Sequence, residues 1–218
     1  MKYKNIIFDL GNVLVALDNE ACARAFIALG CERLVNVDSD PAVKQLFDQL
    51  GLGLITNGQF YAQVRLLTGT TATDAQIDAA CNAMLTVIPD VKKQRLLDLR
   101  QAGCHTFLLS NTIDIHWRYC LKHLWPYGNY GIDDFFDQAF VSQEMHLLKP
   151  SREIFQAVID RTGIVPADTL FIDDIKENCE GAERLGIHTF NNVHFNDWLA
   201  LDLYCPGSPW RGALPTDI

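Results

Sequence analysis

Polar side chains suited to catalysis or metal binding follow three short apolar stretches of the sequence. Residues 6–8 lead to Asp9, residues 106–109 to Ser110 and Asn111, and residues 169–172 to Asp173 and Asp174. Such apolar runs predict buried strands, and parallel strands place their carboxyl ends at one edge of a sheet, where ligands bind in open α/β folds. The pattern therefore predicts one shared cluster, in which Asp9 is a candidate nucleophile or metal ligand.

The predicted cluster has a definite electrostatic requirement. Carboxylates gathered in one cleft repel one another, which raises their pKa values unless a cation lies among them. Because the ligands on offer are oxygens rather than a His or Cys cluster, we expect a hard ion, Mg²⁺. Taken singly, Ser110 with Asn111 fits a helix cap, Lys149 a surface lysine, and Asp173 with Asp174 a solvated turn. Their joint occurrence favours a shared site.

The elements that position these residues alternate along the second part of the chain. From residue 89 onward, helical patterns at 91–102, 154–159 and up to residue 185 alternate with strand patterns at 106–109, 138–141, 169–172 and 187–190. Helices that alternate with strands imply a parallel sheet with right-handed crossovers. The predicted fold class is therefore a doubly wound parallel α/β sheet.

Residues 16–88 have a different character and predict helices joined by loops. Gly30 fits the end of a helix over 21–29, and Thr56 or Asn57 can cap a helix reaching residue 67. Thr73 and Gln76 have capping-box spacing before a helix over 77–87. We predict a helical insertion at 16–88, a core of residues 1–15 and 89–204, and an irregular, Pro- and Gly-containing tail at 205–218.

Composition and charge restrict the class of protein. The 218 residues are 49% hydrophobic and 21% charged, and the net charge of -9 argues against a nucleic-acid-binding surface. We find neither a charged-then-apolar leader nor an apolar run near the ~20 residues of a membrane span, so we expect a cytoplasmic protein. The seven cysteines lack CxxC or zinc-type spacing, which favours buried thiols in a reducing compartment.

Four motifs, in this order, resemble those of the haloacid dehalogenase-like (HAD) hydrolases, most of which are Mg²⁺-dependent phosphatases. They are FDLGNVL at Asp9, LLSNT at Ser110, Lys149-Pro150, and FIDD ending at Asp174. Residues 178–187, NCEGAERLGI, are also similar to the family. The closest likeness is to the branch of bacterial sugar-1-phosphate phosphatases and the phosphatase domain of soluble epoxide hydrolases. The resemblance implies a Rossmann-like core with an inserted helical cap that closes over the site and helps to select the substrate.

The resemblance also implies a role for each motif residue. Asp9 would attack phosphorus to give an aspartyl-phosphate, and its carboxylate would also touch Mg²⁺. The Gly11 carbonyl oxygen and Asp174 would bind the metal directly, and Asp173 through water. The transferring phosphoryl group would be held by donors and a positive charge from Ser110, Asn111 and Lys149.

The sequence departs from the family pattern at several positions. Gly11 stands where most of these phosphatases carry a second Asp, whose acid–base help is worth roughly 10² to 10⁴ in rate. The resembling branch also shows DLGNV, so the loss of this Asp need not mean inactivity. Because good leaving groups need less protonation, we hypothesise a substrate such as a sugar 1-phosphate or an acyl phosphate. His116 is a proton donor, a substrate contact or a helix-face histidine. His146 replaces the usual Gly and Leu148 a frequent Arg in the loop before Lys149.

The sequence thus predicts a Mg²⁺-dependent phosphatase acting on a small phosphorylated metabolite, without nucleic-acid or membrane partners. The alternative is a catalytically weak or inactive relative that binds phosphometabolites or a protein, with Gly11 as the sign of lost turnover. A dehalogenase would not need the acid pair Asp173 and Asp174. A receiver domain would place its acid pair before the phosphoacceptor and would be shorter.

Overall fold

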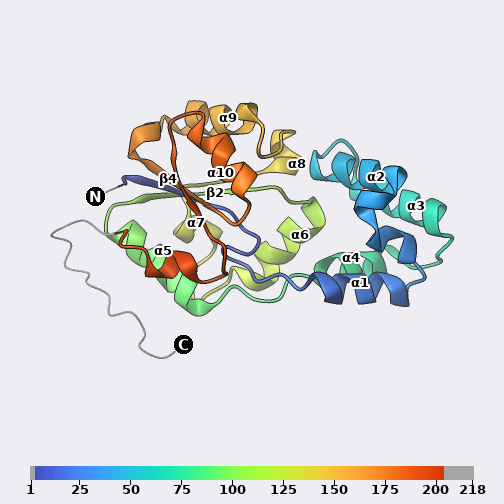
Figure 1. The fold of residues 1–218 in the computed structure, drawn as a ribbon. Helices are drawn as coiled ribbons and strands as arrows, with labels where there is room; N and C mark the ends of the chain where they lie inside the picture. The colour runs from blue at the N-terminus through green and yellow to red at the C-terminus, as the bar shows by residue number, and fades with distance from the viewer. Residues whose placement is uncertain (1–2, 204–218) are drawn as a thin grey trace.

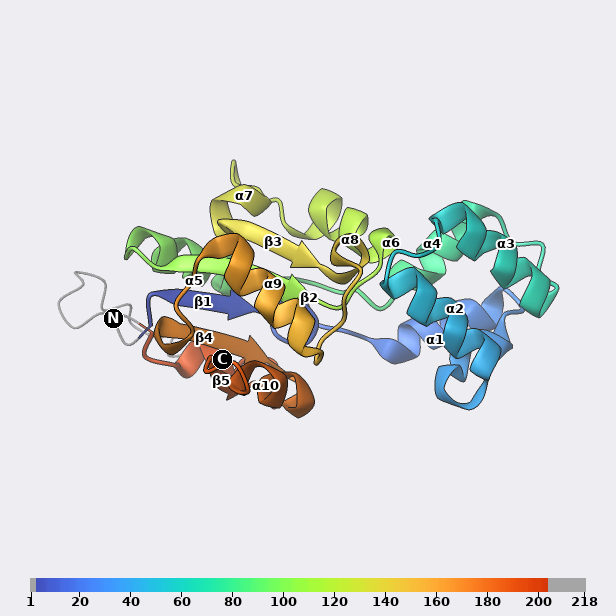
Figure 2. The same cartoon turned by 90° about the horizontal axis from the view of Figure 1, so that it is seen from above.

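A five-stranded parallel sheet forms the centre of the computed structural model, which describes residues 3–203 (Figures 1 and 2). The strand order is β3-β2-β1-β4-β5. The bounds are β1 Asn5–Phe8, β2 His105–Ser110, β3 Gln138–Val141, β4 Thr169–Asp173 and β5 His188–Asn191. Since the chain winds outward on both sides of β1, the strand order reverses there. The carboxyl end of β1, where Asp9 lies, is therefore the topological switch point at which open α/β sheets bind ligands.

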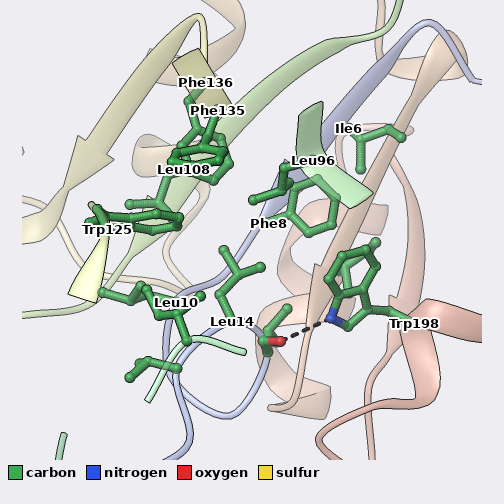
Figure 3. Packing of buried hydrophobic residues seen from close by; sticks show 14 of the residues in the cluster. Ile6, Phe8, Leu10, Leu14, Leu96, Leu108, Trp125, Phe135, Phe136 and Trp198 are labelled. Carbon is green, nitrogen blue, oxygen red and sulfur yellow. Dashed lines mark hydrogen bonds between the residues drawn. The ribbon is translucent and has the colours of Figure 1, made fainter. Parts of the chain in front are cut away.

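Residues of β1 alternate between two hydrophobic layers, one on each face of the sheet. Ile6 and Phe8 pack with α5 (Asp90–Gln101), whereas Ile7 packs with α9 (Arg152–Thr162) and α10 (Lys176–Glu183). On the first face, Phe8 makes edge contacts with Phe136 and Trp198 (Figure 3). Because both faces of the sheet are covered, the strands are continuous apolar runs. This is the doubly wound arrangement that the alternating pattern predicts.

Four helices lie beyond the carboxyl ends of the strands (Figure 2). They are α1 Asn19–Ala28, α2 Pro41–Gly51, α3 Asn57–Thr68 and α4 Asp74–Asn82. The predicted capping box of Thr73 with Gln76 is present, and Thr56, one of the two predicted caps, forms another capping box with Gln59. The four helices bury their own hydrophobic cluster, which also includes Ile113 from the end of the sheet. The insertion therefore packs against the strand ends, while its boundaries at 16 and 88 stay a prediction.

The helix predicted over 77–87 is wrong in its second half. Helix α4 ends at Asn82, and the chain then pairs in an antiparallel bridge of Leu85 with Leu17. Thr86 N donates to Ala16 O, and Ala16 N donates to Val87 O. The pairing partner is distant in sequence, so the helical pattern is overridden by the two strand-like connections between insertion and core.

The remaining short elements were not predicted from the sequence. They are α6 Asp114–Tyr119, the π-helical η3 Cys120–Leu124, α7 Ile132–Phe135, α8 Ser142–Met145 and the 3₁₀ turns η1 Glu32–Val35, η2 Val37–Ser39, η4 Pro166–Asp168 and η5 Asp197–Ala200. Among the helices between residues 3 and 203, none combines the length and apolar character needed to cross a bilayer. The predicted irregular tail at 205–218 lies outside the described residues.

Candidate active site

Lys149 joins the first and last acidic motifs at the carboxyl edge of the sheet. Its Nζ donates to Asp9 Oδ1 at 2.6 Å, to Asp173 Oδ2 at 2.7 Å and to the Leu109 carbonyl oxygen at 2.8 Å. The Lys149 side chain is 1% exposed and that of Asp9 10%. Three parallel strands therefore converge on one buried ammonium group, as the predicted cluster requires.

Asp173 is fully buried, and both of its carboxylate oxygens accept hydrogen bonds. Oδ1 accepts from Ile175 N at 2.8 Å and from Asn178 Nδ2 at 3.0 Å, and Oδ2 accepts from Lys149 Nζ. Asn178 also lies 3.1 Å from Oδ2. These donors hold the Asp173 carboxylate in place. Because both of its oxygens are already occupied by hydrogen bonds, the carboxylate is suited to orienting Lys149 rather than to binding a metal ion directly.

Asp174 is held by an asparagine that sequence reasoning did not single out. Asn12 Nδ2 donates to Asp174 Oδ2 at 3.1 Å, and Asn191 Nδ2 donates to the Asp174 carbonyl oxygen at 2.9 Å. Asn12 has φ 51°, in the left-handed region that asparagine tolerates better than most residues. The sequence signal that could have identified Asn12 is its position directly after Gly11, because an asparagine there tolerates the left-handed turn and its side chain can reach Asp174.

Contacts from the C-terminal part of the core fix the loop that follows Asp9. The Val13 carbonyl oxygen accepts from Lys92 Nζ at 2.6 Å and from Trp198 Nε1 at 2.9 Å (Figure 3). Asn192 Nδ2 donates to the Asn12 carbonyl oxygen at 3.0 Å. Buried donors thus define the path of the backbone at Asn12 and Val13, directly after Gly11.

The charges of the cluster are unbalanced in a way that fits a divalent cation. Asp9, Asp173 and Asp174 each offer a carboxylate oxygen, all within 4.8 Å of one another, against the single ammonium of Lys149. Burial raises the pKa of Asp9 to about 7, with Lys149 lowering it and Asp173 raising it. Burial likewise raises the pKa of Asp174. Although burial alone lowers the pKa of Lys149, the two carboxylates raise it above its usual value, so the lysine is charged.

Ser110 and Asn111 lie beside this cluster but differ in their contacts. Ser110 is buried as the last residue of β2. Asn111 Nδ2 donates to the Lys149 carbonyl oxygen, and Lys149 N donates to Asn111 Oδ1, both at 2.9 Å. This reciprocal pair fixes the backbone that carries Lys149. All of the sequence-predicted site residues therefore meet at one edge, with the Asn111 side chain engaged by the lysine loop.

A cavity of about 320 Å³ opens between this edge and the helical insertion. Gly11, Ser110 and Asn111 line its inner end, and His116 lines its side. His116 Nε2 lies 3.1 Å from the Cys81 carbonyl oxygen, which can only accept, so Nε2 carries a proton. Burial lowers the pKa of His116 to about 4, partly opposed by that hydrogen bond, so the ring is neutral near pH 7.

The structure accounts for the two residues that depart from the family pattern in the loop before Lys149, His146 and Leu148. His146 ends α8 with φ 56°, a left-handed conformation that favours glycine, and its Nδ1 donates to the Leu52 carbonyl oxygen at 2.8 Å. The histidine thereby links the core to the end of α2. Leu148 lines the cavity, where it contributes apolar surface.

The doubly wound fold, the inserted helices and the acidic cluster define a class of protein. Residues 3–186 match the sequence profile of the haloacid dehalogenase-like hydrolases, and the chain belongs to this family. The predicted family, fold class and hydrolase assignment are confirmed.

Three relatives show how closely the chain resembles known members. It is 28% identical to D-ribitol-5-phosphate phosphatase of Bacteroides thetaiotaomicron over 89% of this chain and 94% of the relative. A crystal structure of a HAD family enzyme from that organism, in complex with magnesium and inorganic phosphate, is 41% identical, with TM-score 0.81 over 86% of this chain and 93% of that one. A predicted HAD-like hydrolase from Porphyromonas gingivalis is 32% identical, with TM-score 0.82 over 91% and 95%.

Proposed function

We propose that the chain is a Mg²⁺-dependent phosphatase that hydrolyses a small phosphomonoester through an aspartyl-phosphate on Asp9. The observation that carries this proposal is the buried Asp9–Lys149 pair, with 2.6 Å between Oδ1 and Nζ, beside a cavity lined by Gly11 and Ser110. A carboxylate can attack a phosphate dianion only where positive charge offsets their repulsion. The phosphatase and phosphate-bound relatives support the same class of reaction.

The residues divide the work as follows. Asp9 attacks phosphorus in line, the bond from phosphorus to the leaving oxygen breaks, and water then hydrolyses the aspartyl-phosphate. Lys149 and Ser110 stabilise the phosphoryl oxygens, while Asn111 holds the Lys149 backbone in place. The oxygen donors of Asp9, Asp174 and the Gly11 carbonyl would hold Mg²⁺, with Asp173 acting through water. When bound, the ion supplies positive charge to the phosphoryl group.

Protonation of the leaving oxygen is the weak point of this site. Gly11 has no side chain to donate a proton, and His116 is neutral near pH 7 with its Nε2 proton directed to Cys81. A leaving group of low basicity avoids the need for a proton. By this criterion alone, a sugar 1-phosphate and an acyl phosphate both qualify.

Hydrolysis of p-nitrophenyl phosphate with and without Mg²⁺ tests the proposal. We expect Mg²⁺-dependent turnover that Asp9→Asn reduces by more than about 10³-fold. Asp38→Asn is the matched control, because Asp38 is exposed in the helical insertion and should retain full activity. If the wild type shows no turnover across a panel of divalent metals and phosphate esters, the phosphatase proposal fails and the binding-module alternative is favoured.

A further inference from the structure

A second cavity adjoins the first one within the helical insertion. It has a volume of about 440 Å³ and is lined by α1, by the segment 34–37 and by the end of α4. The two cavities share four lining residues, which form the boundary between them: Phe47, Met84, Ile113 and His116. A molecule anchored at Ser110 and Gly11 would extend past these four side chains, away from the sheet and between the helices, to reach the second cavity.

The walls of both cavities are mostly carbon. Leu10, Val15, Leu17 and Leu85 line the first, and Ala23, Phe26, Leu34 and Val37 line the second. Met84 lies at their boundary, and its flexible thioether side chain can adapt to the shape of an occupant. Burial of an apolar ligand group against such walls makes the free energy of binding more favourable.

Three polar side chains along the walls already have partners within the protein. His116 Nε2 donates to Cys81 O, and Ser142 Oγ contacts both Gly51 O and Thr112 O at 2.8 and 2.9 Å. Asp48 pairs with Lys44 at the exposed surface. A sugar bound here would bury hydroxyl groups with few partners, which costs free energy for each unsatisfied group. An apolar leaving group carries no such cost.

Building on the phosphatase function proposed above, we propose that the two cavities bind an elongated apolar leaving group of low basicity, an aryl or long-chain acyl phosphate. Asp9 forms a bond to phosphorus, and the electron pair of the broken bond stays on the departing phenolate or carboxylate oxygen, which needs no proton. Water then attacks the aspartyl-phosphate, which releases inorganic phosphate and restores the Asp9 carboxylate. The apolar walls and the glycine at position 11 thus favour the same substrates, phosphates whose leaving group is apolar and weakly basic.

A series of 4-alkylphenyl phosphates with methyl, butyl and octyl chains tests this proposal. The leaving phenols have nearly equal basicity, so kcat/KM reports the burial of the chain. We expect kcat/KM to rise by up to about fourfold per methylene while the chain lies within the cavities. An ethylene-glycol chain of matched length, which is polar, should give no rise.

Two variants locate the effect on the second cavity. Ala23→Phe fills that cavity, so the rise should stop at shorter chains than in the wild type. Ala79→Phe adds the same ring at an exposed position of α4 and should keep the full rise. Circular dichroism checks that both variants fold.

Binding of the matching arylphosphonates, which are not hydrolysed, separates this inference from the proposed function. Isothermal titration with Mg²⁺ should give a Kd that falls with chain length, even if p-nitrophenyl phosphate is not turned over. A Kd and a kcat/KM that are both independent of chain length would overturn the inference. So would a preference for the ethylene-glycol series.

Discussion

The ammonium group of Lys149 lies 2.6 Å from the Asp9 carboxylate, although 140 positions separate the two residues in the sequence. Both groups are buried, and Asp173 shares the same lysine. This pair keeps the proposed nucleophile and the proposed phosphate-binding cation in contact. Removal of the Lys149 ammonium group would leave the carboxylates of Asp9 and Asp173 facing one another without a positive charge between them.

Lys149→Met should therefore destabilise the protein and suppress its activity. Removing one partner of a buried ion pair costs about 3 to 5 kcal/mol, and losing one charge-stabilising donor costs about 10² to 10³ in kcat. We expect Mg²⁺ to recover more stability in the variant than in the wild type, because the ion replaces the lost charge. Urea unfolding with and without Mg²⁺ measures this. Lys44→Met, at a surface pair with Asp48, should cost less than about 1 kcal/mol.

Substitution of Asn12 should separate its backbone role from its hydrogen bond to Asp174. Asn12→Gly keeps the φ of 51° accessible and removes the side chain, so it should weaken Mg²⁺ affinity with little loss of stability. Asn12→Ala adds backbone strain of about 1 kcal/mol to the same loss. Mg²⁺ titration of activity and thermal unfolding distinguish the two effects. Equal Mg²⁺ affinity in wild type and Asn12→Gly would show that this hydrogen bond does not position Asp174.

Gly11→Asp should supply the missing proton donor. A Cβ at Gly11 would lie 3.0 Å from Leu17 Cδ1, the mobile end of a side chain, so the change requires a small shift of Leu17. We expect hydrolysis of alkyl phosphates, whose leaving groups are basic, to accelerate by up to about 10². The rate with p-nitrophenyl phosphate should change little. Gly11→Asn is the control of similar size, and equal acceleration by Asn would refute an acid role.

His116 should make stability depend on pH in mildly acidic solution. Its pKa is lowered to about 4 in the fold, whereas an unfolded histidine titrates near 6.5, so between these values only the unfolded chain gains the proton. The contribution of His116 to the free energy of unfolding should fall as pH falls through this window. We expect His116→Gln to lessen the loss between pH 7.5 and pH 5 by about 2 kcal/mol, measured by urea unfolding. The exposed His194→Gln should leave the loss unchanged.

The sequence by itself determined the strands, most helix starts and the set of charged candidate site residues. Apolar runs that end in Asp9 and Asp173, the helix cap at Thr56 and the capping box at Thr73 are local patterns whose physics acts within a few residues. The tertiary structure alone decided which partners those residues have. Lys149 bridges two acids, Asn12 reaches Asp174, and the chain after α4 pairs with Leu17.

The shape and polarity of the cavity also needed the tertiary structure. Its walls come from the loop after β1, from α1, α2 and α6, and from the chain after α4, segments that meet only when the insertion packs on the sheet. Contacts between distant segments depend on the complete packing of the chain rather than on local preference. The sequence thus indicated the candidate reactive groups, and the fold decided what they face.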